Sequence, residues 1–147
     1  MDRMTGNKFQ LKFWHPLTRE LIERVVTSIA EVRQQAEVAF EMYRSEGVDY
    51  YPGIAVWSGD DDPANSLTIC ATPEGYALIY TDEDYLQTVT ASGREPDGAA
   101  QRIQLDDFIE VPNRAFLDKE AALGIVAAWM ESGTLPDDAD FTNEIYE

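Results

Sequence analysis

The alternation of hydrophobic and polar positions at the start of the chain predicts a hairpin followed by a helix. Residues 11–14 and 20–26 each carry closely spaced apolar side chains, and a Pro-containing break separates them, which is typical of two short strands. Ser28, with Glu31 three residues later, has the form of a helix capping box. We therefore expect a helix that begins there and ends just before Gly47.

The sequence also permits a second interpretation of residues 20–26. Apolar side chains from Ile22 to Tyr43 fit a spacing of three and four, which would make one long helix beginning near Thr18. The run Val25-Val26-Thr27 disfavours that helix, because β-branched side chains lose rotamer freedom in a helix. We expect the strand and keep the helix as the alternative.

Shorter periods after the first helix predict a sheet. Four segments have the composition of strands: 53–58, 66–72, 76–80 and 85–91. Residues 73–75, Pro-Glu-Gly, fit a tight turn between the second and third of them. From Ile103 to Val111 every second residue is apolar except Asp107. This pattern predicts one further strand, in which Asp107 marks either a bulge or a functional exception.

The clearest element is a helix near the C-terminus. Asp118 can cap it, and it runs to about Ser132 with Gly133 as its stop. Its expected buried stripe comprises Leu123, Val126, Ala127 and Met130, with Ala122, Ile125 and Trp129 beside it. Residues 140–146 could return as an edge strand. Together these elements predict a single α+β domain over residues 1–147, with a mostly antiparallel sheet of about five to seven strands and two main helices packed on one face.

Charge is distributed very unevenly along this chain. Residues 1–57 carry seven basic and eight acidic side chains, whereas residues 58–147 carry four basic and twenty acidic ones, giving a net charge of −17. Such a surface repels nucleic acids and anionic membranes and attracts a basic partner. The absence of a long apolar run near the start, together with a single cysteine, predicts a cytoplasmic protein.

The C-terminal half resembles a known family. The sequence from Ile109 to Pro112, the acidic-capped helix from Asp118 to Leu123, and the segment from Trp129 to Pro136 are similar to immunity protein family one of bacterial polymorphic toxin systems. The resemblance implies an α+β protein that binds and neutralises a cognate toxin domain encoded beside it. Toxins paired with this family are often nucleic-acid deaminases, and nucleases and other toxins are the alternatives. The family supplies no fixed set of inhibitory residues to transfer to this chain.

Three acidic clusters are the candidate partner-binding sites. They are Asp60, Asp61 and Asp62; Asp82, Glu83 and Asp84 with the adjacent Tyr85; and Asp106 with Asp107. Carboxylates orient a basic partner, and a neighbouring aromatic ring supplies desolvated contact area. The first two clusters are also compatible with ordinary solvated turns, and Asp107 with a bulge.

The residues that enzymes commonly use are scarce in this sequence. It has one histidine, His15, and one cysteine, Cys70, so neither a nucleophile–base pair nor a zinc site is suggested. We predict a non-enzymatic protein with no cofactor or metal, a monomer or weak dimer whose partner is a basic toxin domain. The alternatives are an acidic nucleic-acid mimic, a small adaptor, or a carboxylate-based enzyme.

Overall fold

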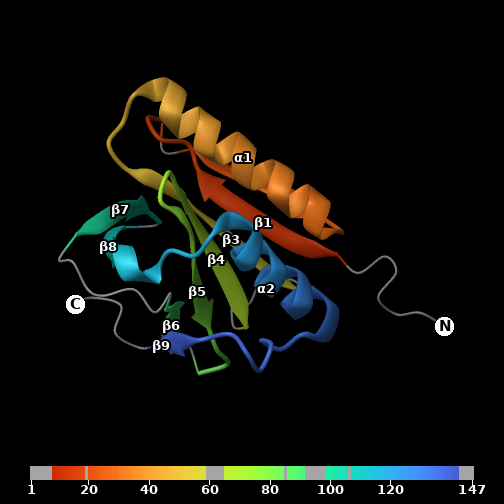
Figure 1. The fold of residues 1–147 in the computed structure, drawn as a ribbon. Coiled ribbons are helices and arrows are strands. Elements are labelled where there is room, and N and C mark those ends of the chain that lie inside the picture. The colour runs from red at the N-terminus through yellow and green to blue at the C-terminus, as the bar shows by residue number, and fades with distance from the viewer. Residues whose placement is uncertain are drawn as a thin grey trace.

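A sheet with both main helices on one face forms the described part of the chain (Figure 1). The computed structural model describes residues 8–18, 20–58, 65–84, 86–91, 99–105 and 107–142. Its strands are β1 (Phe9–Trp14), β2 (Leu21–Val26), β3 (Tyr51–Ser58), β4 (Ser66–Thr72), β5 (Gly75–Thr81), β6 (Gln87–Thr90), β7 (Ala100–Gln104), β8 (Phe108–Pro112) and β9 (Phe141–Thr142). Its helices are α1 (Ile29–Glu46), α2 (Lys119–Ser132) and the short 3-10 helix η1 (Asn113–Ala115).

The sheet is antiparallel except at one junction. Its main path runs β2-β1-β3-β4-β5-β6-β9. From this path β7 branches off, pairing in parallel with the start of β3 and antiparallel with β8. The described residues thus contain nine strands, more than the five to seven predicted. The predicted α+β class, with a mostly antiparallel sheet and two main helices on one face, is confirmed.

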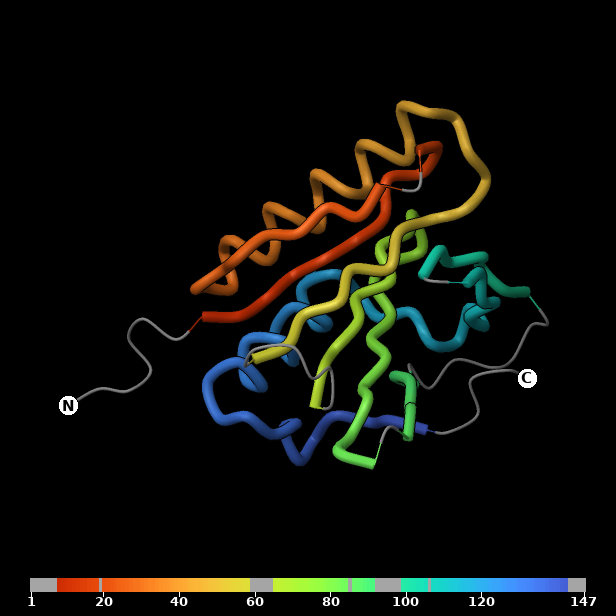
Figure 2. Tube along the Cα trace, turned by 180° about the vertical axis from the view of Figure 1, so that it is seen from behind, coloured from red at the N-terminus to blue at the C-terminus, as the bar shows by residue number. Residues whose placement is uncertain are grey.

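The main hydrophobic core lies between the sheet and the two long helices. Figure 2 shows the sheet from its other side, with both helices behind it. Helix α1 contributes Val32, Ala36 and Ala39, and α2 contributes Ala122, Leu123, Val126, Trp129 and Met130. The strands contribute every second side chain, as their period of two requires: Phe9, Leu11, Phe13, Val26, Ile54, Val56, Leu67, Ile69, Ala71, Tyr76 and Leu78.

A second, smaller core covers part of the opposite face of the sheet. The β7–β8 hairpin and η1 fold over this face and bury its side chains. The members of this core are Cys70, Ala77, Ile79, Val89, Ile103, Val111, Ala115 and Phe116. The hairpin covers the part of the face nearest the start of β3, and no other described segment covers the remainder of that face.

The single strand predicted from Ile103 to Val111 is wrong. The chain reverses direction after Gln104, and the backbone N–H of Leu105 donates to the carbonyl of Asp107 at 3.0 Å. In the hairpin Ile103 lies opposite Ile109, so the odd-numbered strand residues face the same way on both strands. The alternation of apolar and polar residues is therefore the same in one long strand as in this hairpin. Asp107 belongs to the turn of the hairpin rather than to a bulge.

The predictions for the first 47 residues are confirmed. Strands β1 and β2 form the expected hairpin, so the alternative of one long helix is wrong. The hydroxyl of Ser28 accepts a hydrogen bond from the backbone N–H of Glu31 at 3.2 Å, as in a capping box. The Glu31 carboxylate accepts from the backbone N–H of Thr27 at 2.6 Å, one residue earlier than the standard box. Helix α1 ends at Gly47, whose φ is 73°.

Helix α2 has its predicted bounds but not its predicted cap. Asp118 occupies the N-cap position, yet its side chain makes no capping hydrogen bond. The helix ends at Gly133 as expected, and Leu135 folds back against the main core. Ile125 and Ala127 are only partly buried. Of the strands predicted at 85–91 and 140–146, the described residues contain β6 and β9, which pair with each other, while residues 85 and 143–146 lie outside the description.

Candidate functional site

The uncovered part of the sheet forms a hollow of about 440 Å³ on the face opposite the helices. Its floor is made of small and hydroxyl-bearing side chains, because the register places Ala55 opposite Thr68 and Ser66 opposite Thr81 on this face. The full lining, which we call the sheet hollow, is Lys12, Phe13, Trp14, Gly53, Ala55, Ser66, Thr68, Thr81, Gln87, Leu105, Asp107 and Ile109. The hollow is open to solvent, and its lining comes from segments between Lys12 and Ile109.

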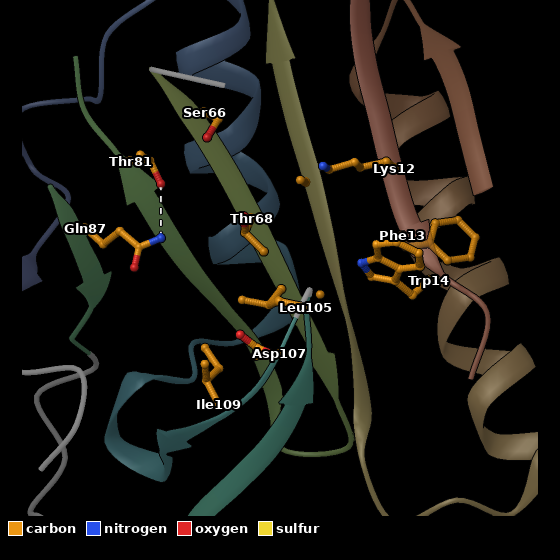
Figure 3. A pocket seen from close by; sticks show the side chains of 12 residues that line it. Lys12, Phe13, Trp14, Ser66, Thr68, Thr81, Gln87, Leu105, Asp107 and Ile109 are labelled. Atoms are coloured by element: carbon orange, nitrogen blue, oxygen red, sulfur yellow. Dashed lines mark hydrogen bonds between the residues drawn. The ribbon is translucent and has the colours of Figure 1, made fainter. Parts of the chain in front are cut away.

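Two different walls border the sheet hollow (Figure 3). Lys12 and Trp14 on β1 stand on one side. Leu105 and Asp107 from the turn of the β7–β8 hairpin lie across the sheet from them. The hollow therefore presents a cation and a carboxylate on opposite walls, with apolar surface between them.

Trp57 lies beneath the cationic wall and is buried rather than exposed. The Lys12 ammonium lies 5.6 Å from the centroid of the Trp57 ring, a cation–π distance. Trp57 is only 9% exposed, and its indole Nε1 has no hydrogen-bond partner within the described residues. Leaving such a buried donor unpaired costs about 1–3 kcal/mol. Because its side chain is buried in spite of this cost, Trp57 is a packing residue rather than an exposed anchor.

The acidic turn between β5 and β6 divides into one structural and two available carboxylates. Asp82 accepts hydrogen bonds from the backbone N–H groups of Asp84 at 2.8 Å and Leu86 at 3.0 Å, so it stabilises the turn. Glu83 and Asp84 are exposed and form no ion pair with any described residue. The pKa of Tyr80 is raised, first by burial and then by the charges of Asp82 and Glu83.

Of the other predicted site residues, one lines the sheet hollow and five lie outside the residues that the structure describes. Asp60, Asp61, Asp62, Tyr85 and Asp106 lie outside the described residues. Asp107 is exposed and lines the sheet hollow. Thr81 and Gln87, which lead into and out of the acidic β5–β6 turn, line it as well. The structure thus brings Asp107 to the same surface as the ends of β5 and β6, which the turn containing Glu83 and Asp84 connects.

A second hollow, of about 600 Å³, was not suggested by the sequence. It lies between α1, the β4–β5 turn and the start of α2, and we call it the α1–α2 cleft. Its lining residues are Glu37, Phe40, Glu41, Thr72, Pro73, Glu74, Gly75, Tyr76, Asp118 and Lys119. The lining residues come from three parts of the chain that are distant in sequence. Local sequence predicts the β4–β5 turn but not the approach of the three parts.

Some charges in and beside the α1–α2 cleft are paired. Lys119 lies 3.4 Å from the Glu37 carboxylate, and Arg44 lies 2.6 Å from Glu41. Beside the cleft, Arg33 forms a two-bonded ion pair with Glu120 that joins α1 to α2. The hydrogen bond from Arg33 lowers the pKa of Glu120.

Two lining carboxylates of the α1–α2 cleft have no such partner. Glu74 and Asp118 make no side-chain hydrogen bond or ion pair with the residues that the structure describes. Both belong to exposed residues. They are therefore the carboxylates of this cleft that are available to a ligand.

The single histidine and the single cysteine have structural positions. The Nδ1 atom of His15 accepts from the backbone N–H groups of Leu17 and Thr18 at 3.2 and 3.3 Å, so it stabilises the turn between β1 and β2. Cys70 is fully buried, and burial raises the pKa of its thiol to about 12. At neutral pH this thiol is protonated and inaccessible.

Comparisons with known proteins add no assignment. No protein-family model, no curated protein and no solved structure matches this chain. Within the described ranges, no three His, Cys, Asp or Glu side chains are grouped so that they could hold a metal ion. Neither long helix of those ranges has the length and apolar character that crossing a membrane requires.

Proposed function

We propose that this chain is an immunity protein that binds a cognate bacterial toxin domain and blocks that domain's basic substrate site. The resemblance of the C-terminal half to immunity protein family one supports this role. A toxin that acts on nucleic acid needs a cationic groove to hold its polyanionic substrate. An acidic protein that covers this groove excludes the substrate without performing chemistry. The cytoplasm of the producing cell is the location that this role requires.

The observation that carries the proposal is the concentration of exposed carboxylates in one part of the chain. Twenty of the twenty-eight acidic residues belong to residues 58–147, which contain four basic ones. Within the described part of that range, every Asp and Glu except Asp82 is exposed. Their summed field attracts a cationic protein before contact, which raises association rates by about 10–10³-fold.

The sheet hollow and its neighbouring carboxylates are the surface that we assign to the toxin. Glu83 and Asp84 form no ion pair with the residues that the structure describes, and Asp107 stands on the wall of the hollow. Exposed charges of this kind set the association rate, whereas the desolvated centre of an interface sets the dissociation rate. In this arrangement the carboxylates steer the toxin, and the apolar lining between Trp14 and Leu105 slows its release.

Reversing the two available charges of the β5–β6 turn tests this assignment. We expect Glu83→Lys with Asp84→Lys to slow association with the toxin domain encoded beside this protein by about tenfold at low salt. The dissociation rate should change by less than about twofold, because the two carboxylates are exposed. Asp82 is left intact because it stabilises the turn. Stopped-flow fluorescence with a catalytically inactive toxin domain measures both rates.

A matched double variant separates a local effect from a change in net charge. Glu23→Lys with Glu46→Lys alters the net charge by the same amount at two exposed residues, on β2 and at the end of α1. We expect this control to slow association by no more than about twofold. Equal slowing in the two double variants would show that the β5–β6 turn does not face the toxin.

A further inference from the structure

The outer edge of strand β2 is open. This strand lies at one end of the sheet path and, within the described ranges, pairs with β1 alone. Glu23, Arg24 and Val25 are exposed, and the apolar side chain of Val25 is 56% exposed. No described backbone group bonds to the side of β2 that faces away from β1. An edge of this kind is a template on which another strand can pair.

The hydrogen-bond pattern of the β1–β2 hairpin decides which residues of this edge are available. The backbone N–H of His15 donates to the carbonyl of Glu20 at 2.8 Å, and the same register continues to Phe9 opposite Val26. In an antiparallel pair, residues bonded to the partner strand alternate with residues whose N–H and C=O point to the other side. The residues of β2 that point outward are therefore Leu21, Glu23 and Val25.

One of these outward carbonyl groups accepts a bond from a neighbouring side chain. The guanidinium of Arg24 donates to the carbonyl of Glu23 at 2.8 Å. A strand added to this edge would bring a backbone N–H to the same carbonyl. Arg24 would then be free to contact a group on the added strand.

The charge around this edge favours a second copy of the chain over a basic partner. Residues 1–57 carry seven basic and eight acidic side chains, and β2 itself carries one of each. A strongly basic protein therefore gains little attraction here. Two copies of a chain with a net charge of −17 repel each other least where these nearly neutral parts meet, because salt screens exposed charges more than about 8 Å apart.

The sequence of β2 is also complementary to itself. In a two-fold antiparallel pair, one residue lies opposite its own copy. Centring the pair on Glu23 or Arg24 would place like charges opposite each other, which is destabilising, and centring it on Val25 would form no ion pair. Centring it on Ile22 places Glu20 opposite Arg24 of the second copy on both sides of the axis. Glu20 is exposed, and its carboxylate forms no ion pair with a described residue.

We propose that two copies of this chain pair through their β2 edges, antiparallel and centred on Ile22, to form a weak dimer. Leu21 and Glu23 both point outward, so each exchanges backbone hydrogen bonds with the other residue on the second copy. The interface is small because it is confined to residues 20–24 of each chain, and we expect a Kd on the order of 0.1 mM. Strands β5 and β6 lie toward the other end of the sheet path, so the dimer leaves the acidic β5–β6 turn free.

Sedimentation equilibrium of the purified full chain tests the dimer directly. As the protein concentration rises from about 0.02 to 1 mM, we expect the average mass to increase from near 16.6 kDa toward twice that value. A mass that stays at 16.6 kDa over this range would overturn the proposal. So would a mass that exceeds that of a dimer, because a two-fold pair is closed.

Reversing single charges tests the register. Arg24→Glu places two carboxylates opposite each other and Glu20→Arg places two guanidinium groups opposite each other, so each variant should raise the Kd about tenfold. The two variants change the net charge in opposite directions, so an effect of overall charge alone would weaken one dimer and strengthen the other. The double variant restores opposite charges and should return the Kd to within about threefold of the wild-type value. Failure of the double variant to dimerise would overturn this pairing.

A proline on β2 tests the use of the edge itself. Glu23→Pro removes an N–H that points away from β1, so the dimer should be lost while the circular dichroism spectrum is retained and the denaturant midpoint of the monomer changes little. Arg24→Pro is the control, because it removes an N–H that bonds to β1 and should lower that midpoint clearly. Dimer formation by a folded Glu23→Pro protein at the wild-type Kd would show that β2 edges do not pair.

Discussion

Replacing Gly75 by alanine is expected to lower the free energy of unfolding by about 3 kcal/mol or more. Gly75 has a φ of +128°, which side-chain-bearing residues rarely adopt, and a Cβ atom there would lie 2.1 Å from the carbonyl oxygen of Leu117. That carbonyl cannot move freely, because Tyr76 and Leu117 exchange two backbone hydrogen bonds of 3.0 and 2.9 Å. Urea unfolding followed by circular dichroism measures the change.

The chain contains a matched glycine for this measurement. Gly124 lies in the middle of α2, and a Cβ atom there would meet nothing within 4 Å. Gly124→Ala should raise the free energy of unfolding by about 0.5–1 kcal/mol, because alanine loses less backbone entropy in a helix. A Gly75→Ala protein as stable as the wild type would contradict the close contact with Leu117. That contact also positions Glu74 and Tyr76 beside Asp118 in the α1–α2 cleft.

Replacing Trp129 by alanine is expected to lower the free energy of unfolding by about 3–5 kcal/mol. The side chain is 1% exposed, and its ring lies 5.6 Å from that of Phe9 between helix and sheet. Its Nε1 donates to Oδ1 of Asn65 at 3.1 Å, and the same oxygen accepts from the Tyr80 hydroxyl at 2.6 Å. The loss therefore includes packing and a shared polar contact. Calorimetry or urea unfolding gives the value.

A pair of phenylalanine variants separates the polar contact from the packing. Trp129→Phe and Trp57→Phe remove the same atoms from two buried indoles, but only the Nε1 of Trp129 has a hydrogen-bond partner in the described residues. Trp129→Phe should therefore be the more destabilising by about 1–3 kcal/mol. Equal losses would show that the bond to Asn65 contributes nothing measurable.

Local sequence was sufficient for the helices and insufficient for the hairpin at residues 100–112. The cap at Ser28 and the stop at Gly47 act within one or two turns, so the bounds of α1 could be predicted. The pairing of Ile103 with Ile109 preserves the alternation of a single strand, so the pattern could not reveal the reversal. The short β9 and the parallel pairing of β7 with β3 depend on contacts between distant segments.

The candidate sites show the same division. The acidic turn at Asp82 could be found because its residues are neighbours in sequence. The α1–α2 cleft could not, because Glu37, Glu74 and Asp118 come together only when the helices pack on the sheet. The one local signal was the β4–β5 turn, where Glu74 precedes the glycine that contacts Leu117.

The proposed function requires a toxin domain encoded beside this protein, and inhibition of that domain tests the central claim most directly. In a titration at low salt, the toxin's activity on nucleic acid should fall linearly to zero at one equivalent of this protein. The inhibition should weaken as sodium chloride is raised from about 0.02 to 0.5 M, because salt screens exposed charges. Full toxin activity in the presence of a large excess of this protein would contradict the account.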